Sequence, residues 1–177
     1  MKTTAKFLAY VLRHNPSAAN ITLDQNGWAD VAELIDGACA VGRKLDIASL
    51  EDIVATDGKQ RFSFNCDRTK IRANQGHSVA VDVQMVELEP PSVLYHGTAE
   101  KYVTSIKERG ICKQSRNYVH LSIDTETAFK VGSRHGKAVI FAVNARQMYA
   151  DGYRFLLSAN GVWQTEYVPI KYITQIL

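Results

Sequence analysis

The segment RFSFNCDRTKIRA, residues 61–73, contains two short runs, RFSF and TKIRA, on either side of the polar stretch 65–68. Strand-forming runs that flank a short polar stretch predict a β-hairpin. We therefore expect two antiparallel strands that close the first half of the chain.

Three helical patterns precede this hairpin. The first is expected to be capped by Thr3 or Thr4 and to stop near Asn15, because the residue before a proline disfavours the α conformation. Two further helices are expected after Asp30 and Asp46, which are favourable N-cap residues. Three small helices followed by a hairpin are the element order of a winged-helix module, which is a fold class and not yet a function.

Beyond residue 88 the pattern changes to many short strands with few helices. Pro90 and Pro91 form a stiff connector, so we expect two lobes, residues 1–88 and 89–177. The predicted strands are 93–96, 118–121, 137–143, 154–157, 162–168 and 171–176. The predicted helices are 98–109, 124–132 and a short one at 145–150. The fold class is therefore α+β, with the second lobe built on a mixed sheet.

The composition excludes several classes of protein. Of the 177 residues, 46% are hydrophobic and 22% are charged, which is typical of a globular chain. No apolar run approaches the ~18 residues of a membrane span, and the N-terminal stretch lacks a signal-peptide cleavage pattern. Three widely spaced cysteines give neither a disulfide framework nor a zinc motif. We therefore expect a cytoplasmic protein that does not associate with membranes.

The positive charge is unevenly distributed. The net charge is +3, but residues 1–88 hold ten basic and eleven acidic residues, whereas residues 89–177 hold eleven and seven. Within the first half, residues 59–72 are locally basic, which suits contacts with a nucleic-acid backbone.

Common ligand motifs are absent from the sequence. There is no HExxH and no histidine pair with ligand spacing, so no metal site is predicted. The segment 132–138, GSRHGKA, resembles a phosphate loop but has one residue too few between its glycines and lacks the final Ser or Thr. The chain also contains no GxGxxG motif.

Three polar clusters leave two interpretations open. Arg13-His14 can complement the dipole of the first helix or bind an anion. Arg72, in the donor-rich segment 71–78, is either a solvated residue at a strand end or a ligand for an anion. The segment 95–98 is either an ordinary turn with Thr98 as helix cap or an anion site at a helix start. His120 by itself is more typical of a core histidine.

Taken together, these clusters resemble one family, the RNA 2′-phosphotransferases, over almost the whole chain. The matching motifs, in order, are Arg13-His14-Asn15-Pro16, Gly27-Trp28, Arg61-Phe62, Ile71-Arg72-Ala73-Asn74-Gln75-Gly76-His77-Ser78, Leu94-Tyr95-His96-Gly97-Thr98, His120-Leu121-Ser122, Gly132-Ser133-Arg134-His135-Gly136 and Asn160-Gly161-Val162-Trp163.

The resemblance implies an N-terminal winged-helix-like RNA lobe and a C-terminal ADP-ribosyltransferase-like lobe that holds NAD⁺ as co-substrate. The activity it implies transfers an internal RNA 2′-phosphate, as at a tRNA splice junction, to NAD⁺ through a 2′-phospho-ADP-ribosylated RNA. The products are 2′-OH RNA, nicotinamide and ADP-ribose 1″,2″-cyclic phosphate. The partner is then a tRNA-like or short RNA, no metal is needed, and a monomer is expected.

The same resemblance implies the site residues. The catalytic set maps onto Arg13, His14, Arg72 and Arg134, of which the first three would bind the RNA phosphate. The NAD⁺ contacts map onto His96, Gly97, Thr98, His120, Ser122, Gly132 and Val168.

The chain departs from the family pattern at two positions. Ile111 and Gln164 stand where Leu is usual or common, and neither is expected to touch the chemistry. Glu166 is expected to share a strand face with Val168, where it would mimic the glutamate of other ADP-ribosyltransferases.

Two alternative functions stay open. One is ADP-ribosyl transfer to a nucleic-acid terminal phosphate or a protein, and the other is a non-enzymatic winged-helix regulator.

Overall fold

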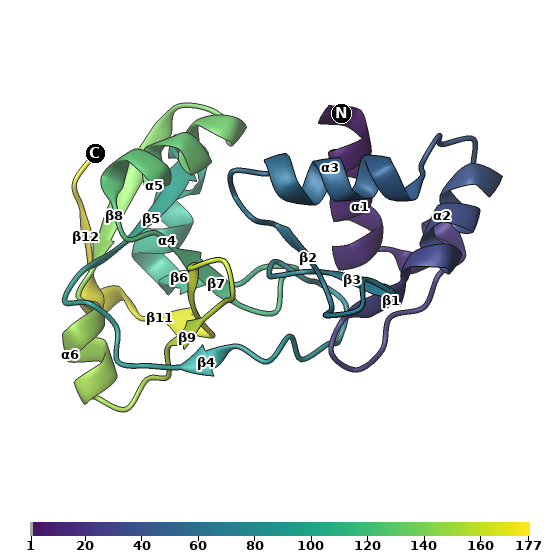
Figure 1. Cartoon of the computed structure of the whole chain (residues 1–177). Helices are drawn as coiled ribbons and strands as arrows, with labels where there is room; N and C mark the ends of the chain where they lie inside the picture. Colours follow the sequence, from purple (N-terminus) through teal and green to yellow (C-terminus); the bar gives the residue numbers. More distant parts are fainter. Residues whose placement is uncertain (1) are drawn as a thin grey trace. The chain divides into compact units, whose positions relative to one another are not determined.

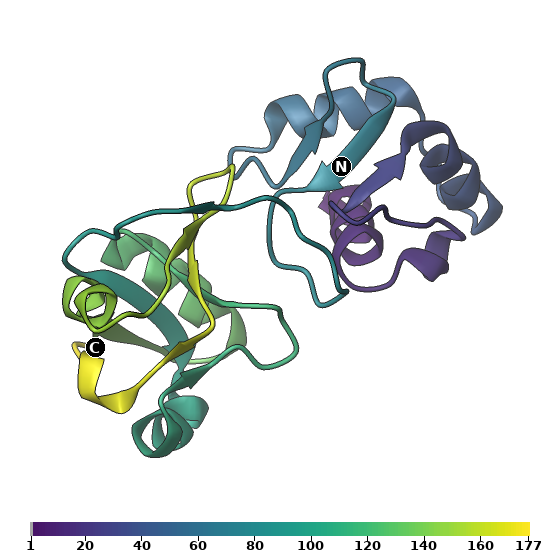
Figure 2. The ribbon, with the colours of Figure 1, turned by 90° about the horizontal axis from the view of Figure 1, so that it is seen from below.

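The computed structural model describes residues 2–177, which form two compact units, Met1–Gln84 and Met85–Leu177. Within this part of the chain there are six α-helices and several small antiparallel sheets, so the fold is mixed α and β, as the sequence predicts (Figure 1). Figure 2 shows the first unit in purple to teal and the second in teal to yellow. Each unit has its own hydrophobic core.

The helices of unit 1 are α1 (Lys2–Arg13), α2 (Val31–Ala40) and α3 (Ile47–Thr56). Two predicted caps are confirmed, since Asp30 accepts a hydrogen bond from the backbone N–H of Glu33 and Asp46 accepts one from that of Ser49. The predicted cap at Thr3 or Thr4 is wrong. Both threonines already lie inside the first turn of α1, whereas a cap needs a non-helical backbone.

The predicted hairpin is confirmed as β2 (Phe62–Phe64) and β3 (Lys70–Ala73), which pair antiparallel with Phe62 opposite Ala73. A third strand, β1 (Trp28–Asp30), pairs with the other edge of β3 and gives the order β1-β3-β2. The sequence did not predict β1, because a strand of three residues that ends at the helix cap Asp30 is too short to show periodicity. It is β1 that places Trp28 opposite Arg72.

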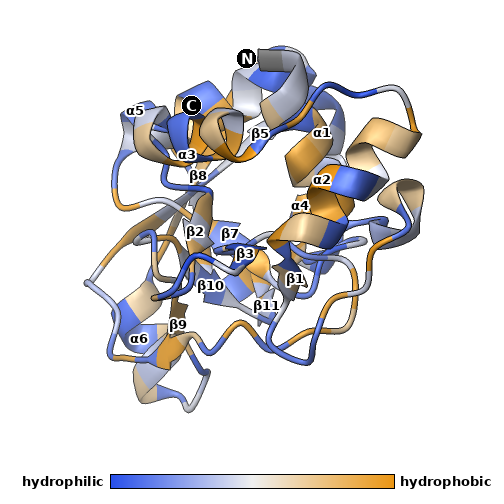
Figure 3. Ribbon diagram, turned by 45° about the vertical axis from the view of Figure 1, so that its right-hand side comes forward, coloured by the Kyte–Doolittle hydropathy of each residue, from blue (hydrophilic) through white to orange (hydrophobic). Residues whose placement is uncertain are grey.

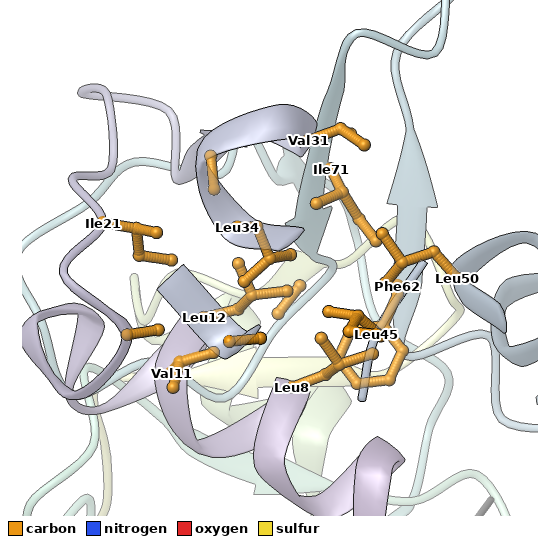
Figure 4. Close-up of a cluster of buried hydrophobic side chains, with 14 of the residues drawn as sticks. Leu8, Val11, Leu12, Ile21, Val31, Leu34, Leu45, Leu50, Phe62 and Ile71 are labelled. Atoms are coloured by element: carbon orange, nitrogen blue, oxygen red, sulfur yellow. The ribbon is translucent and has the colours of Figure 1, made fainter. Parts of the chain in front are cut away.

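The core of unit 1 lies between α1, α2, α3 and this sheet (Figure 4). Leu8 and Leu12 of α1, Leu34 of α2 and Leu50 of α3 are fully buried. Figure 3 shows the apolar stretches of α1 and α2 in orange. Because this core anchors α1, it also positions Arg13, the last residue of the helix, and His14, which follows it.

Replacement of Gly37 by alanine is expected to destabilise unit 1 by about 3 kcal/mol or more. A Cβ at Gly37 would lie 1.8 Å from the carbonyl oxygen of Ala19, so α2 would have to move away from the 3₁₀-helix Pro16–Ala19. Urea unfolding of the two proteins measures the loss. Gly58→Ala is the control, since a Cβ there meets nothing within 4 Å. A midpoint shift no larger than that of the control would contradict the close approach.

Unit 2 contains three sheets. The first sheet has the order β12 (Ile173–Gln175), β8 (Ala138–Val143), β5 (Leu94–Ala99). The second has the order β4 (Val86–Glu87), β9 (Leu156–Leu157), β10 (Trp163–Thr165), β7 (Val119–Leu121). The third pairs β11 (Tyr167–Val168) with β6 (Ile111–Cys112). A single bridge between Tyr95 and Ser122 links β5 to the end of β7.

The helices of unit 2 are α4 (Val103–Arg109), α5 (Thr125–Gly132) and α6 (Ala145–Ala150), with 3₁₀-helices η2 (Glu100–Tyr102), η3 (Ser133–His135) and η4 (Ile170–Tyr172). The predicted helix start with Thr98 as cap is wrong. Thr98 lies inside β5 opposite Val139, because the ladder between β5 and β8 continues to Ala99.

The predicted strand 162–168 is interrupted at Glu166. Residues 163–165 and 167–168 belong to different sheets, and Glu166 lies in the bend between them. Glu166 is exposed whereas Val168 is fully buried, so the expectation that they share a strand face is wrong. Residues 171 and 172 of the predicted last strand belong instead to a 3₁₀-helix, Ile170–Tyr172.

No helix within residues 2–177 combines the length and the apolar character that a membrane crossing requires.

Candidate functional site

In unit 1 the end of α1 and the segment 76–79 are tied together. The carbonyl oxygen of Arg13 accepts hydrogen bonds from the N–H groups of Ser78, at 2.9 Å, and Val79, at 3.4 Å. The side chain of Ser78 also lies 2.9 Å from Nδ1 of His14. Gly76, with φ +89°, lies against the Arg13 guanidinium, since a Cβ there would be 3.5 Å from Nη1. Two motifs that are far apart in the sequence therefore meet around Arg13 and His14.

The guanidinium of Arg72 is oriented by Trp28 of β1 and by Asn26, which precedes that strand. Its Cζ lies 4.4 Å from the ring centroid of Trp28, and its Nη1 donates a hydrogen bond to the carbonyl oxygen of Asn26 at 3.5 Å. Burial lowers the pKa of Arg72, and the negative charge of Asp24 partly offsets this. Arginine nevertheless stays charged at any ordinary pH. Arg72 is thus a stacked, half-buried cation.

The other cations of the hairpin face carboxylates. Arg61 pairs with Asp57 at 2.8 Å, Arg68 with Glu51 at 2.7 Å, and Lys70 with Asp24 at 3.2 Å. Within residues 2–177, Arg72 forms no such ion pair. The basic character of residues 59–72 is therefore largely neutralised, and Arg72 is distinguished from its neighbours as a cation available to an anion.

The pKa of His77 reflects the positive charges of Arg13, His14 and Arg72. This histidine is only 3% exposed, and burial together with the positive charges of Arg13, His14 and Arg72 lowers its pKa to about 4. No carboxylate is among the groups that shift this pKa. The positive charges of these three groups therefore act on one buried region of unit 1, which favours an anion there.

His77 is expected to make unit 1 sensitive to acid. Because its folded pKa lies below the unfolded value of 6.5, its contribution to stability is complete above pH 6.5 and is lost as the pH falls toward 4. The loss between about pH 7.5 and about pH 4.5 is about 2.5 kcal/mol.

Urea unfolding at both pH values of the unaltered protein and of His77→Gln measures this effect. The variant should lose markedly less free energy of unfolding between the two pH values. His135→Gln, at an exposed position, is the control and should keep the original pH dependence. An unchanged pH dependence in His77→Gln would show that this histidine is not the acid-sensitive group.

In unit 2, His96 and His120 meet where β5 joins β7. The backbones of Tyr95 and Ser122 exchange two hydrogen bonds of 2.8 Å, and Nδ1 of His96 lies 3.1 Å from the carbonyl oxygen of His120. Burial lowers the pKa of His96, although this hydrogen bond opposes the shift, so the ring is neutral at pH 7. A carbonyl only accepts, so Nδ1 carries the proton, and Nε2 is left as a hydrogen-bond acceptor.

Arg116 lies beside His120, with 3.5 Å between its Nη1 and Nδ1 of the histidine. A guanidinium only donates, so Nδ1 of His120 is the acceptor in this contact. Burial and the positive charge of Arg134 lower the pKa of Arg116. Neither arginine forms an ion pair among the described residues. Arg134 was predicted from its motif, whereas no pattern in the sequence pointed to Arg116, since its contact with His120 depends on how the loop before β7 folds.

Gly97 and Gly132 allow α5 to pack closely on β5. A Cβ at Gly97 would lie 1.7 Å from the carbonyl oxygen of Ala128, and one at Gly132 would lie 2.6 Å from that of Thr98. Both glycines are therefore required for the packing that holds the His96 strand. Their contacts with a nucleotide remain predictions.

The other residues predicted to contact NAD⁺ contribute to the structure of unit 2 through backbone hydrogen bonds or through burial. Ser122 forms the bridge to Tyr95, Thr98 is 9% exposed within β5, and Val168 is fully buried in the core of unit 2. Unit 2 also has a cavity of about 460 Å³, and none of the predicted site residues lines it. Its lining residues are Ser92, Val93, Ala142, Asn144, Arg146, Gln147, Ala150, Tyr172 and Thr174. No cluster of three or more candidate metal ligands occurs in the described part of the chain.

The family model and the similar proteins described below carry the same description. The model of the RNA 2′-phosphotransferase, Tpt1 / KptA family matches residues 1–167. A "Probable RNA 2′-phosphotransferase" of Flavobacterium johnsoniae is 51% identical over 172 residues, which cover 97% of this chain and 94% of the relative. Proteins of the same description from Agrobacterium fabrum and Fusobacterium nucleatum are 50% and 49% identical, over 97% and 95% of this chain and 92% and 94% of their own lengths. The chain belongs to the RNA 2′-phosphotransferase, Tpt1 / KptA family.

Proposed function

We propose that this protein is an NAD⁺-dependent RNA 2′-phosphotransferase. It would transfer an internal RNA 2′-phosphate to NAD⁺ and release 2′-OH RNA, nicotinamide and ADP-ribose 1″,2″-cyclic phosphate. The observation that supports it most is the cluster of Arg13, His14 and Arg72 around the buried, neutral His77. Cations that act together on one region suit a phosphate, and guanidinium groups can bind it bidentately.

In the first step the RNA phosphate attacks C1″ of the nicotinamide ribose. The phosphate is already anionic at neutral pH, and nicotinamide leaves without needing a proton, so the step requires orientation more than a general base. Arg13, His14 and Arg72 would bind the phosphate oxygens. The hydrogen bond between His14 and Ser78 holds the imidazole, and the Trp28 ring holds the Arg72 guanidinium.

The residues of unit 2 fit a dinucleotide. Nε2 of the neutral His96 is an acceptor that suits a ribose hydroxyl, while Arg116 and Arg134 are cations that suit the phosphates. NAD⁺ supplies an electrophilic C1″ and a leaving group. The chain's own part is to hold the ribose and to neutralise negative charge.

In the second step the ribose 2″-OH attacks the transferred phosphate and expels the RNA 2′-oxygen. Negative charge grows on the phosphoryl oxygens, and an arginine stabilises such charge. Arg134 has this role in our proposal, and His14 protonates the leaving oxygen.

The proposal extends to the two lobes and to the cellular role. Three helices with the sheet β1-β3-β2 support a winged-helix-like RNA lobe, and the helix-covered sheets of unit 2 support an ADP-ribosyltransferase-like lobe. The functional lobes are proposed as residues 1–88 and 89–177. In the sequence, the boundary between the two compact units falls between Gln84 and Met85. A monomer that processes tRNA-like or short RNA in the cytoplasm completes the proposal.

The test uses NAD⁺ and a short RNA with one internal 2′-phosphate. We expect one nicotinamide released for each phosphate removed, and no nicotinamide release with the same RNA lacking the 2′-phosphate. Retention of the 2′-phosphate in the presence of NAD⁺ would overturn the proposal.

The alternative of ADP-ribosyl transfer to a protein or to a terminal phosphate depends on Glu166. Its exposed position in a bend, away from the buried Val168, does not favour such a role. Glu166→Ala is therefore expected to keep the activity that Arg72→Ala loses. The regulator alternative predicts RNA or DNA binding without release of nicotinamide, which the same assay would detect.

A further inference from the structure

Gln164 lies on β10, directly opposite His120 of β7 in the antiparallel register. The adjacent pair, Trp163 and Leu121, belongs to the hydrophobic core of unit 2. Because successive side chains point to opposite faces of a sheet and paired residues point to the same face, Gln164 and His120 share the face opposite this core. The position that was expected to lie away from the chemistry is therefore the cross-strand neighbour of a predicted nucleotide residue.

The side chain of Gln164 is 2% exposed, and its Nε2 has no hydrogen-bond partner among residues 2–177. On the other side of β10 the residue paired with Gln164 is the apolar Leu156. A buried amide without a partner is costly, and such groups in native proteins need an explanation. A hydrogen-bond acceptor supplied by a ligand on the same face would satisfy it.

We propose that the side-chain amide of Gln164 donates a hydrogen bond to the dinucleotide co-substrate bound beside His120, and so sets the affinity of this chain for it. This inference rests on the proposed function. NAD⁺ offers ribose, phosphate and carboxamide oxygens as acceptors, and Arg116, which contacts His120, is a cation that favours the phosphate part. A leucine side chain at this position could not make the bond, because it has no donor.

The test measures the Kd of NAD⁺ for the full chain without RNA. Gln164→Leu and Gln164→Met remove the donor and keep the volume, and both are expected to raise Kd about 3- to 10-fold. The thermal stability of the unliganded protein should stay equal or rise, because a buried polar group without a partner is removed. Gln175→Leu, at an exposed position of β12 in the same unit, is the matched control and should leave Kd unchanged.

Turnover separates a binding role from a general structural one. With saturating NAD⁺ the Gln164 variants should keep kcat while KM rises. ADP-ribose as a second probe locates the contact: an equal loss of affinity for both ligands places it on the ADP-ribose part, and a loss for NAD⁺ alone places it near nicotinamide. Unchanged Kd, or a raised Kd accompanied by a lower melting temperature, overturns the role of Gln164. A lack of NAD⁺ binding by the unaltered protein overturns the proposed function as well.

Discussion

Arg72→Ala is expected to lower the rate of 2′-phosphate removal by about a thousandfold or more. The guanidinium is held in place by the Trp28 ring and by the carbonyl of Asn26, so its orientation is established before any RNA binds. A phosphate that loses a bidentate cation in a partly buried site loses both attraction and position. Single-turnover kinetics with NAD⁺ and a 2′-phosphorylated RNA measure the effect.

Arg72→Lys should recover only a small part of this rate. Lysine keeps the charge, but it lacks the planar fork that binds two phosphate oxygens and stacks on an aromatic ring. Arg68→Ala is the control on the same hairpin, because Arg68 pairs with Glu51 and should be dispensable within a few-fold. Equal losses in the two alanine variants would mean that the hairpin acts through its overall charge and not through Arg72.

Arg134→Ala is expected to stop the reaction after its first step. A 2′-phospho-ADP-ribosylated RNA should accumulate while nicotinamide is still released, because the second step, in which charge develops on the phosphoryl oxygens, slows by about a thousandfold or more. Gel analysis of radiolabelled RNA, with nicotinamide measured in parallel, distinguishes the two steps.

Lys130→Ala is the matched control for Arg134→Ala. Lys130 is an exposed cation of α5 in the same unit and faces Glu126, so its removal should give complete turnover without an intermediate. Complete turnover by Arg134→Ala, or loss of both steps together, would remove Arg134 from the specific role in the second step. In the latter case Arg116, the neighbouring cation, becomes the residue to test.

Local sequence signals predicted most of the fold because they act over a few residues. Asp30 and Asp46 cap helices through bonds to residues three positions ahead, and the two strand-forming runs on either side of residues 65–68 are enough to predict a hairpin. The bounds of strands that pair with segments far away in the sequence could not be predicted from local patterns. The length of β5 depends on its ladder with β8, and the break at Glu166 depends on which strand each side pairs with.

The site residues also divide into those that a local motif predicts and those that only contacts between distant segments bring together. The resemblance to a family predicts Arg13, His14, Arg72 and the histidines as site residues by their motifs, and their roles stay predictions. Arg116 escaped notice because its contact with His120 appears only once the loop and β7 are built. Gln164 was set aside as a neutral substitution, because only the strand register places it opposite His120.

The carboxylate partners of the hairpin cations have a consequence for selectivity among RNAs. A cation that already faces Asp or Glu displaces few counterions when a nucleic-acid backbone approaches, so Arg61, Arg68 and Lys70 add little to general affinity. On the proposed function, the vast excess of unmodified RNA in a cell is then attracted weakly and with a shallow dependence on ionic strength. A branch phosphate monoester carries close to two negative charges, and the binding energy is concentrated on that rare group.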